Sequence, residues 1–295
     1  MSVSSKSKEK RFDKNKPIKP ITNLDKKREK PLYIKPDITV DELTTALYQV
    51  TEQLNEANKT LKQQEQLRMD MFSNISHDLR SPIAAIRSSL EYLQSIPSVD
   101  PEELRYLLMN MTQRIIFIEK MIDDIFLLTI LDNETIPFHF DKVDLGILLE
   151  DFFYTNVSDN KYKHRNLNLA VPETLRITVS IDAEKIIRVL DNLFTNSLKY
   201  STEGDSITLD AFLDSNYVIV KISDTGQGIK RENITRIFDR CFTESNSRTP
   251  SPLVGCGLGL SIAKSIIERH KGMIWCNSKL GSGSDFYFSL PLIFE

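Results

Sequence analysis

The stretch DNLFTNSLKY, residues 191–200, decides how the second half of this chain folds and what it can hold. It belongs to a segment with helical periodicity, 183–199, so Asn192, Asn196 and Lys199 fall at helical steps on one face. Amide oxygens beside a cation on one face could hold a metal-bound triphosphate. The stretch therefore predicts a phosphate site on a helix.

Helical and strand-like patterns alternate on both sides of that stretch. Helices interspersed with short strands favour a two-layer α/β sandwich, with helices on one face of a mixed sheet, over residues 134–295. The expected helices are 144–154 and 183–199, and the expected strands are 176–181, 207–213, 217–223, 273–276 and 285–290.

Two glycine-rich segments follow within this domain. DTGQGI, residues 224–229, comes directly after a strand, so the Asp224 carboxylate can accept a hydrogen bond from an exocyclic amine. GCGLGLS, residues 255–261, runs into a helical segment, 262–271, and such a turn is a phosphate cradle. The polar residues 245–252 between them predict a flexible lid or a long surface loop.

The chain before residue 134 has the periodicity of long helices. Heptad-like steps from Val40 to Leu61 predict a short coiled coil within 39–68. Apolar residues then resume in a shifted register, which could relay torsion or simply end the coil.

A helical hairpin is expected over residues 69–133. The first helix should run until Pro97, and a second should start at Pro101 and reach about Leu131. Their wide apolar faces need a partner, and a dimeric four-helix bundle formed with a second copy is the economical outcome.

The block FSNISHDLRSP, residues 72–82, places His77 beside Asp78 on the first helix of that hairpin. His77 lies opposite the apolar stripe and should face solvent. A neutral imidazole nitrogen can attack phosphorus, while a neighbouring carboxylate takes or orients the proton of the other nitrogen. Pro82 removes a backbone donor and can bend the helix there. Alone, a helical histidine is more often structural.

Composition narrows the class of protein. The chain has 295 residues, 40% of them hydrophobic and 27% charged, which is typical of a folded protein of about two domains. No apolar run approaches the roughly 18 residues of a spanning helix, and no secretory signal is present. Three cysteines, Cys241, Cys256 and Cys276, do not form a disulfide or zinc pattern. We expect a cytoplasmic location.

The first 38 residues differ from the rest in charge. Residues 1–40 hold 12 Lys and Arg against 5 Asp and Glu, in a chain whose formal net charge is -3. Their many prolines and few apolar residues predict a disordered basic tail. The tail is a solvated arm or a segment attracted to anionic lipid, and without aromatic residues between its charges it does not indicate specific nucleic-acid binding.

In their order, these blocks resemble the sensor histidine kinases of bacterial-type two-component systems over about residues 65–291. The matching segments are the phosphoacceptor box at 77–82, the asparagine box at 192–200, the first glycine box at 224–228, the phenylalanine box at 237–242, the second glycine box at 255–260 and the closing turn at 281–288. The resemblance implies the histidine kinase/gyrase-type ATP-binding fold for the second domain.

The resemblance also assigns roles. His77 would be phosphorylated, Asp78 would assist proton transfer, and the Ser81 hydroxyl could orient a water for phosphatase chemistry. Asn196 would ligate Mg²⁺, and Asp224 would bind the adenine amine of ATP. The residues assigned to the nucleotide are Asn192, Asn196, Lys199, Tyr200, Asp224, Gly226, Gly228, Ile229, Phe238, Arg240, Gly255, Gly257, Leu258, Gly259 and Leu260.

Three positions depart from the family's pattern. Thr243 stands where relatives commonly have an arginine, so Arg240 or Arg248 is expected to supply the charge for the γ-phosphate. Val254 and Cys256 replace a frequent glycine and a frequent threonine, and Cys256 places a thiol near the nucleotide.

The implied function is an ATP-dependent protein-histidine kinase that passes its phosphoryl group to the receiver domain of a response regulator and can act as its phosphatase. Response-regulator choice should depend on exposed residues after the acceptor, such as Arg87, Ser88 and Glu91. The input would come through an upstream sensor protein, the membrane-bound part of a longer receptor, or tail association with the membrane. An ATPase of the gyrase and chaperone type, with a Glu in place of Asn192, and a non-catalytic dimeric scaffold are the alternatives.

Overall fold

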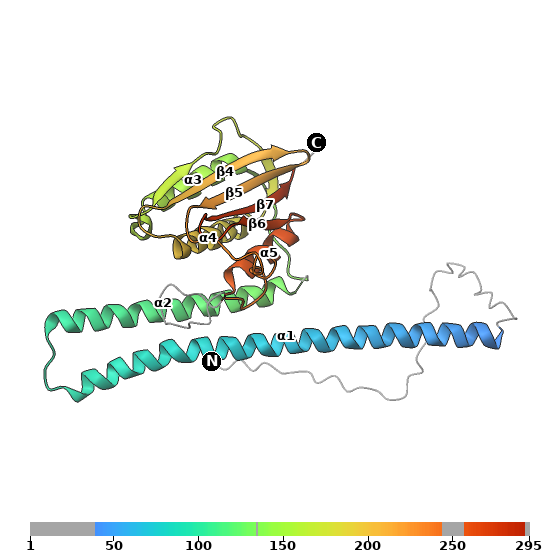
Figure 1. The fold of residues 1–295 in the computed structure, drawn as a ribbon, viewed down its shortest axis with the longest axis horizontal. Helices are drawn as coiled ribbons and strands as arrows, with labels where there is room; N and C mark the ends of the chain where they lie inside the picture. The colour runs from blue at the N-terminus through green and yellow to red at the C-terminus, as the bar shows by residue number, and fades with distance from the viewer. Residues whose placement is uncertain (1–38, 134, 244–256, 293–295) are drawn as a thin grey trace, which may run out of the picture. The chain divides into compact units, whose positions relative to one another are not determined.

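The computed structural model describes residues 39–133, 135–243 and 257–292 (Figure 1). The chain divides into two compact units, residues 1–61 and 62–295. Some predicted features lie outside the described residues. They are the basic tail, the 245–252 segment with Arg248, and the residues Val254, Gly255 and Cys256.

Helix α1, Val40–Ser95, begins in the first unit with a capping box. The Thr39 N–H donates to Glu42 Oε2 at 3.0 Å, and the Glu42 N–H donates to Thr39 Oγ1 at 3.3 Å. The apolar residues of the coiled-coil pattern, including Leu43, Leu47 and Leu54, are more than half exposed in the single chain. Their stripe therefore has no partner within the described part of this one chain.

The hairpin consists of the second part of α1 and of α2, Pro101–Leu131. Proline at the first position of α2 and Glu102 and Glu103 behind it suit a helix start, because the proline lacks an N–H and the acids face the positive helix end. Pro82 lies inside α1, and the helix continues on both sides of it. The Tyr92 hydroxyl donates to Glu103 Oε1 at 2.8 Å and joins the two helices near the turn.

A five-stranded mixed sheet forms the frame of the C-terminal domain. Its strand order is β2-β4-β5-β7-β6, with β2 parallel to β4 and every other pair antiparallel. The strands are β2 Asn166–Leu169, β4 Ser206–Asp214, β5 Tyr217–Asp224, β6 Ile274–Ser278 and β7 Ser284–Pro291. A separate antiparallel pair joins β1, Asp141–Asp144, to β3, Thr178–Ile181.

Helices pack on one face of this sheet. They are α3 Leu145–Val157, α4 Ala183–Tyr200 and α5 Gly259–Arg269, with a short 3-10 turn at Asn160–Tyr162. Along β4, Ile207, Leu209 and Ala211 are fully buried while the residues between them are partly exposed, as expected when one face is covered. Figure 1 shows α4 and α5 together on one side of the sheet. The core includes Phe194 of α4.

The predicted fold class, a helical hairpin followed by a two-layer α/β sandwich, is confirmed. The sequence did not reveal β1 and β2. Each has four residues, and their sequences, DKVD and NLNL, hold too few apolar side chains to show a strand pattern. The division at residues 38, 68 and 133 stays a prediction.

Candidate functional site

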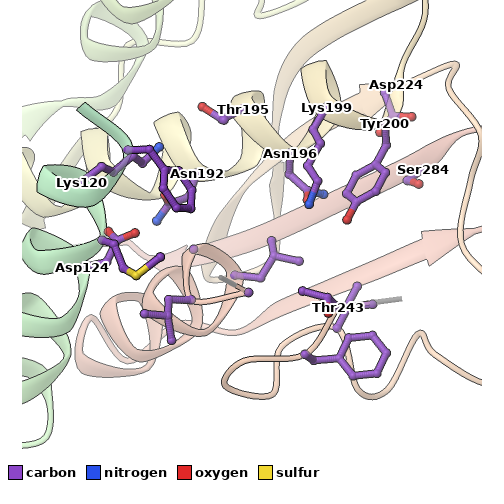
Figure 2. A pocket seen from close by; sticks show the side chains of 18 of the residues that line it. Lys120, Asp124, Asn192, Thr195, Asn196, Lys199, Tyr200, Asp224, Thr243 and Ser284 are labelled. Atoms are coloured by element: carbon purple, nitrogen blue, oxygen red, sulfur yellow. The ribbon is translucent and has the colours of Figure 1, made fainter. Parts of the chain in front are cut away.

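A cavity of about 680 Å³ lies between α4, the start of α5, the end of β5 and the second half of α2 (Figure 2). Cavities of roughly 300 to 1,000 Å³ hold nucleotide-sized ligands in proteins. The predicted site residues that line it are Asn192, Asn196, Lys199, Tyr200, Asp224, Gly228, Ile229, Gly257, Leu258, Gly259 and Leu260. The glycine-rich segments and the asparagine-bearing helix, distant in sequence, thus meet at one cavity.

Helix α4 provides the polar wall of the cavity. It begins at Asp182, whose Oδ1 accepts the Lys185 N–H at 3.2 Å, and this cap fixes the rotation of the helix. Asn192 and Asn196 follow each other by one turn, as Figure 2 shows, and both face the cavity. Asn192 is buried, and its Nδ2 has no hydrogen-bond partner among the described residues. A buried unpaired donor that faces a cavity fits a ligand with acceptor atoms.

Asp224 lies at the end of β5 with its carboxylate held in place. Oδ1 accepts the Gly226 N–H at 3.0 Å, and Oδ2 accepts the Ser197 hydroxyl at 3.3 Å. Burial raises the pKa of Asp224, while these two hydrogen bonds act in the opposite direction. The result is a buried acceptor at the cavity wall whose position is set by its neighbours.

Two glycines at the start of α5 leave room for a ligand. Gly257 has φ +71°, and a Cβ there would lie 2.5 Å from the Phe242 carbonyl oxygen. At Gly259 a Cβ would lie 3.2 Å from Asn192 Oδ1. A side chain at Gly257 would collide with the backbone of residues 241–242, and one at Gly259 would approach Asn192 of α4. The two glycines together form a cradle in front of the free N–H groups of the helix start.

Three predicted nucleotide residues do not line the cavity. Gly226 packs against the backbone of Tyr200, where a Cβ would lie 2.2 Å from its carbonyl oxygen. Phe238 packs against the hydrophobic core. Arg240 pairs instead with the Asp132 carboxylate, with Nη1 donating to Oδ2 at 2.8 Å.

The histidine block lies on α1 and does not line the cavity. The His77 side chain is 53% exposed, as its position opposite the apolar stripe predicts, and its Nδ1 lies 3.4 Å from Asp78 Oδ1. Ser81, one turn further along, is also exposed. Because Pro82 has no N–H, the Asp78 carbonyl lacks its usual helical donor, although α1 continues through this point.

The sequence did not indicate that α2 contributes to the cavity. Lys120, Met121 and Asp124 line it from the hairpin side, and Figure 2 shows Lys120 and Asp124 on the side of Asn192. Asp124 is buried and pairs with Arg188 of α4. These residues belong to an ordinary amphipathic helix pattern, so the sequence offered no motif that could have revealed them.

His270 has a structural position. The Asp182 N–H donates to its Nε2 at 3.0 Å, and its Nδ1 lies 2.8 Å from the Ile266 carbonyl oxygen, which fixes the proton on Nδ1. Burial lowers the pKa of His270 below its ordinary value. The preceding residue, Arg269, donates to the carbonyl oxygens of Ile130 and Ile136, so the end of α5 contacts the last turn of α2 and the segment that follows it.

No cluster of three or more His, Cys, Asp or Glu side chains suited to a metal ion occurs within the described ranges. The Asn196 side chain lines the cavity, and its amide oxygen is a group that could ligate a metal ion there. Over the same ranges, no helix has both the length and the apolar character needed to cross a bilayer.

A helical hairpin with an exposed histidine, followed by an α/β sandwich with a nucleotide-sized cavity, defines a class of proteins that combine a phosphoacceptor domain with an ATP-binding domain. Residues 67–134 match the His Kinase A (phospho-acceptor) domain, and residues 181–293 match the histidine kinase-, DNA gyrase B- and HSP90-like ATPase family. The chain therefore carries a histidine-kinase phosphoacceptor domain followed by an ATP-binding domain of the histidine kinase type, as two-component sensor histidine kinases do.

Individual relatives agree with this assignment. The sensor histidine kinase WalK of Bacillus subtilis (strain 168) is 31% identical over 261 residues, which are 85% of this chain and 40% of WalK. The sensor protein KdpD of Clostridium acetobutylicum is 32% identical over 238 residues, 80% of this chain and 26% of KdpD. The chain thus spans less than half the length of these two relatives.

A solved structure shares the fold. Histidine kinase ThkA, in a crystal structure with the response regulator protein TrrA, has a TM-score of 0.64 and 23% identity, covering 82% of this chain and 67% of that one. The likeness includes both the hairpin and the sandwich, because it extends over more residues than either domain alone has.

Proposed function

We propose that this protein is an ATP-dependent protein-histidine kinase that autophosphorylates His77 and then transfers the phosphoryl group to an aspartate of a response regulator. The observation that carries the proposal is the cavity, where Asp224, Asn196 and the Gly257–Gly259 cradle meet. The exposed pair of His77 and Asp78 in the same chain supplies an acceptor.

The cavity offers a group for each part of an ATP molecule. Asp224 would accept the exocyclic amine of adenine, and Tyr200 and Lys199 would flank the nucleotide. From Tyr200 back to Asn192, α4 rises eight residues, or about 12 Å at 1.5 Å per residue, roughly the reach of the sugar and phosphates. Asn196, between them, would hold Mg²⁺ through its amide oxygen, and the bound ion would neutralise phosphate charge.

The acceptor chemistry follows from the geometry of the histidine block. With the proton on Nδ1, oriented toward Asp78 Oδ1 at 3.4 Å, the lone pair of His77 Nε2 is free to attack the γ-phosphorus. A P–N bond forms, the bond between phosphorus and the leaving oxygen of ADP breaks, and Asp78 stabilises or takes the Nδ1 proton. His77 does not line the cavity, so the nucleotide domain must move, or serve a second chain, for this step.

A homodimer is part of the proposal. Apolar residues on α2 remain exposed in the single chain, among them Ile115 at 47%, Ile122 at 54% and Phe126 at 66%. An exposed apolar face along a hairpin is covered most simply by the same face of a second copy, which gives a four-helix bundle.

The response regulator would dock on the hairpin near His77. ThkA, which shares the fold, was solved with the response regulator TrrA, and this agrees with such a partner. Arg87 and Glu91 form an exposed pair at 3.6 Å, one helical turn apart, about three to four turns beyond the acceptor. Exchanging Arg87, Ser88 and Glu91 for the residues of another kinase should change partner preference, and unchanged preference would contradict this location. The exposed Ser81 hydroxyl would orient water if the protein also acts as a phosphatase.

The proposal is tested by incubating the chain with γ-labelled ATP and Mg²⁺. Label that is stable to alkali and labile to acid should appear on the protein and be lost in His77→Ala and Asn196→Ala. His164→Ala is a matched control, because His164 is also exposed and lies outside the cavity. Release of phosphate without labelled protein would favour the ATPase alternative.

That alternative has less support from the cavity. In the gyrase and chaperone enzymes the resemblance places a Glu at position 192, and this chain has Asn192 there. Asp191 does not line the cavity. Within α4, no carboxylate therefore lines the cavity, and the nearby Asp124 of α2 is paired with Arg188.

A further inference from the structure

The nucleotide cavity lacks a positive charge at position 243, where an arginine is expected to contact the γ-phosphate. Thr243 lines the cavity where an arginine would be expected, and the charge of Arg240 is committed to Asp132. The hydrogen bonds from Asp132 hold the Arg240 guanidinium outside the cavity. Arg248, the other residue expected to supply this charge, lies outside the described residues, so we looked among the described residues for another cation that faces the position of the terminal phosphate.

Lys120 stands at the far end of the cavity. It belongs to α2, and its side chain lines the cavity together with Asn192 of α4. In Figure 2, Lys120 lies beside Asn192, and Tyr200 and Asp224 lie at the opposite end of the row. With adenine at Asp224, a nucleotide that follows α4 for about 12 Å would bring its terminal phosphate toward Asn192 and Lys120.

The neighbouring cations have carboxylate partners at contact distance, whereas Lys120 acts on the Asp191 carboxylate only through a longer-range electrostatic interaction. Arg188 pairs with Asp124, and Lys161 Nζ lies 2.9 Å from Asp159 Oδ2. Over residues 39–133, 135–243 and 257–292, no carboxylate lies within ion-pair distance of Lys120 Nζ. Lys120 lines the cavity and Asp191 does not, so a ligand in the cavity can contact the ammonium group while Asp191 acts on it from outside.

A second observation points to an anion at the same place. Asn192 is 6% exposed, and its Nδ2 donor has no partner within the described part of the chain. Asp191, the nearest carboxylate on α4, does not line the cavity. A buried amide donor without a partner and an ammonium group with no carboxylate at contact distance share this end of the cavity, and phosphate oxygens would accept hydrogen bonds from both.

We infer that Lys120 binds the terminal phosphate of the nucleotide, so that the hairpin itself completes the nucleotide site. This inference rests on the proposed function. It makes Lys120 a residue that distinguishes ATP from ADP, because ADP ends short of it. Helix α2 would then contact the γ-phosphate directly through Lys120, and would contact it only when ATP is bound.

The test is equilibrium binding to the full chain, measured with Mg²⁺ by displacement of a fluorescent ADP analogue. For Lys120→Gln we expect ATP affinity about tenfold lower and ADP affinity within about twofold of wild type, since one charge-assisted contact at a half-open site is lost. Lys120→Arg should restore most of the preference for ATP. Arg105→Gln removes the same charge from an exposed position of α2 away from the cavity and should change neither affinity.

The outcomes separate this inference from the function on which it rests. Equal losses for ATP and ADP in Lys120→Gln, or no loss for either, would overturn the role of Lys120 while leaving nucleotide binding intact. A wild-type chain that binds neither nucleotide would overturn the proposed function itself. Thermal unfolding midpoints of the variants confirm that folded proteins are compared.

Discussion

The ion pair between Asp124 of α2 and Arg188 of α4 should be a main contact between the hairpin and the sandwich. The Asp124 side chain is 8% exposed and the Arg188 side chain 28% exposed, and the Arg188 Nε has no partner among the described residues. Asp124→Asn keeps the shape of the side chain but leaves the guanidinium without a counter-charge.

The size of the effect follows from this burial. Removing one partner of a fully buried pair costs about 3 to 5 kcal/mol, and the remaining exposure of Arg188 reduces this to about 2 kcal/mol. At about 2 to 4 °C per kcal/mol for a unit of this size, the unfolding midpoint should fall by about 4 to 8 °C. Amide hydrogen exchange should also speed up over residues 121–131, where α2 contacts the sandwich.

The assay combines thermal unfolding by circular dichroism with hydrogen exchange. Asp123→Asn is the matched control, because it makes the same change one residue earlier at an exposed position. In a double-mutant cycle with Arg188→Met, the two substitutions should be coupled by about 1 kcal/mol or more. A midpoint for Asp124→Asn equal to that of Asp123→Asn, with unchanged exchange, would refute the reasoning.

Other positions lead to further expected outcomes. Burial lowers the pKa of His270, so below about pH 6.5 the unfolded chain binds more protons than the folded chain, and stability should fall as the pH drops. His270→Gln should make this fall smaller in unfolding midpoints measured from about pH 7.5 to 5.5. An unchanged slope would contradict the role of His270. Gly283 has φ +85°, and a Cβ there would lie 1.9 Å from the Asp224 carbonyl oxygen, so Gly283→Ala should lower the free energy of chemical unfolding by more than about 2 kcal/mol. Gly281 has a similar φ of +79° but open space around it, so Gly281→Ala should lower it by only about 1 kcal/mol. Phe126→Glu, which places a charge on the exposed apolar face of α2, should yield monomers in sedimentation equilibrium, and persistent dimers would place the interface elsewhere.

The sequence predicted those parts of the molecule that depend on local pattern. The start of α2 at Pro101, the strand that leads to Asp224 and the shared face of Asn192 and Asn196 follow from periodicity, capping and turn residues. Contacts between elements were not predictable in this way. Arg240 illustrates this, since its partner Asp132 is 108 residues away and no spacing rule relates the two.

The contribution of α2 to the cavity escaped prediction for the same reason. Lys120 and Asp124 look like ordinary polar residues of an amphipathic helix until the sandwich is placed against them. The position of one folded unit against another depends on the sum of many weak contacts, which a single sequence does not reveal.

The two ends of helix α5 have different roles: one end borders the cavity, and the other contacts α2 and α4. Its first residues form the cradle at the cavity, and Arg269 and His270 at its other end grip the segment after α2 and the start of α4. Eleven residues make a rod of about 16 Å, too short to bend appreciably, so its ends must shift together. The ring centroids of Phe140 and His270 are 5.0 Å apart, so a spectroscopic label on the segment near Phe140 should change its signal when a nucleotide binds in the cavity at the other end of α5.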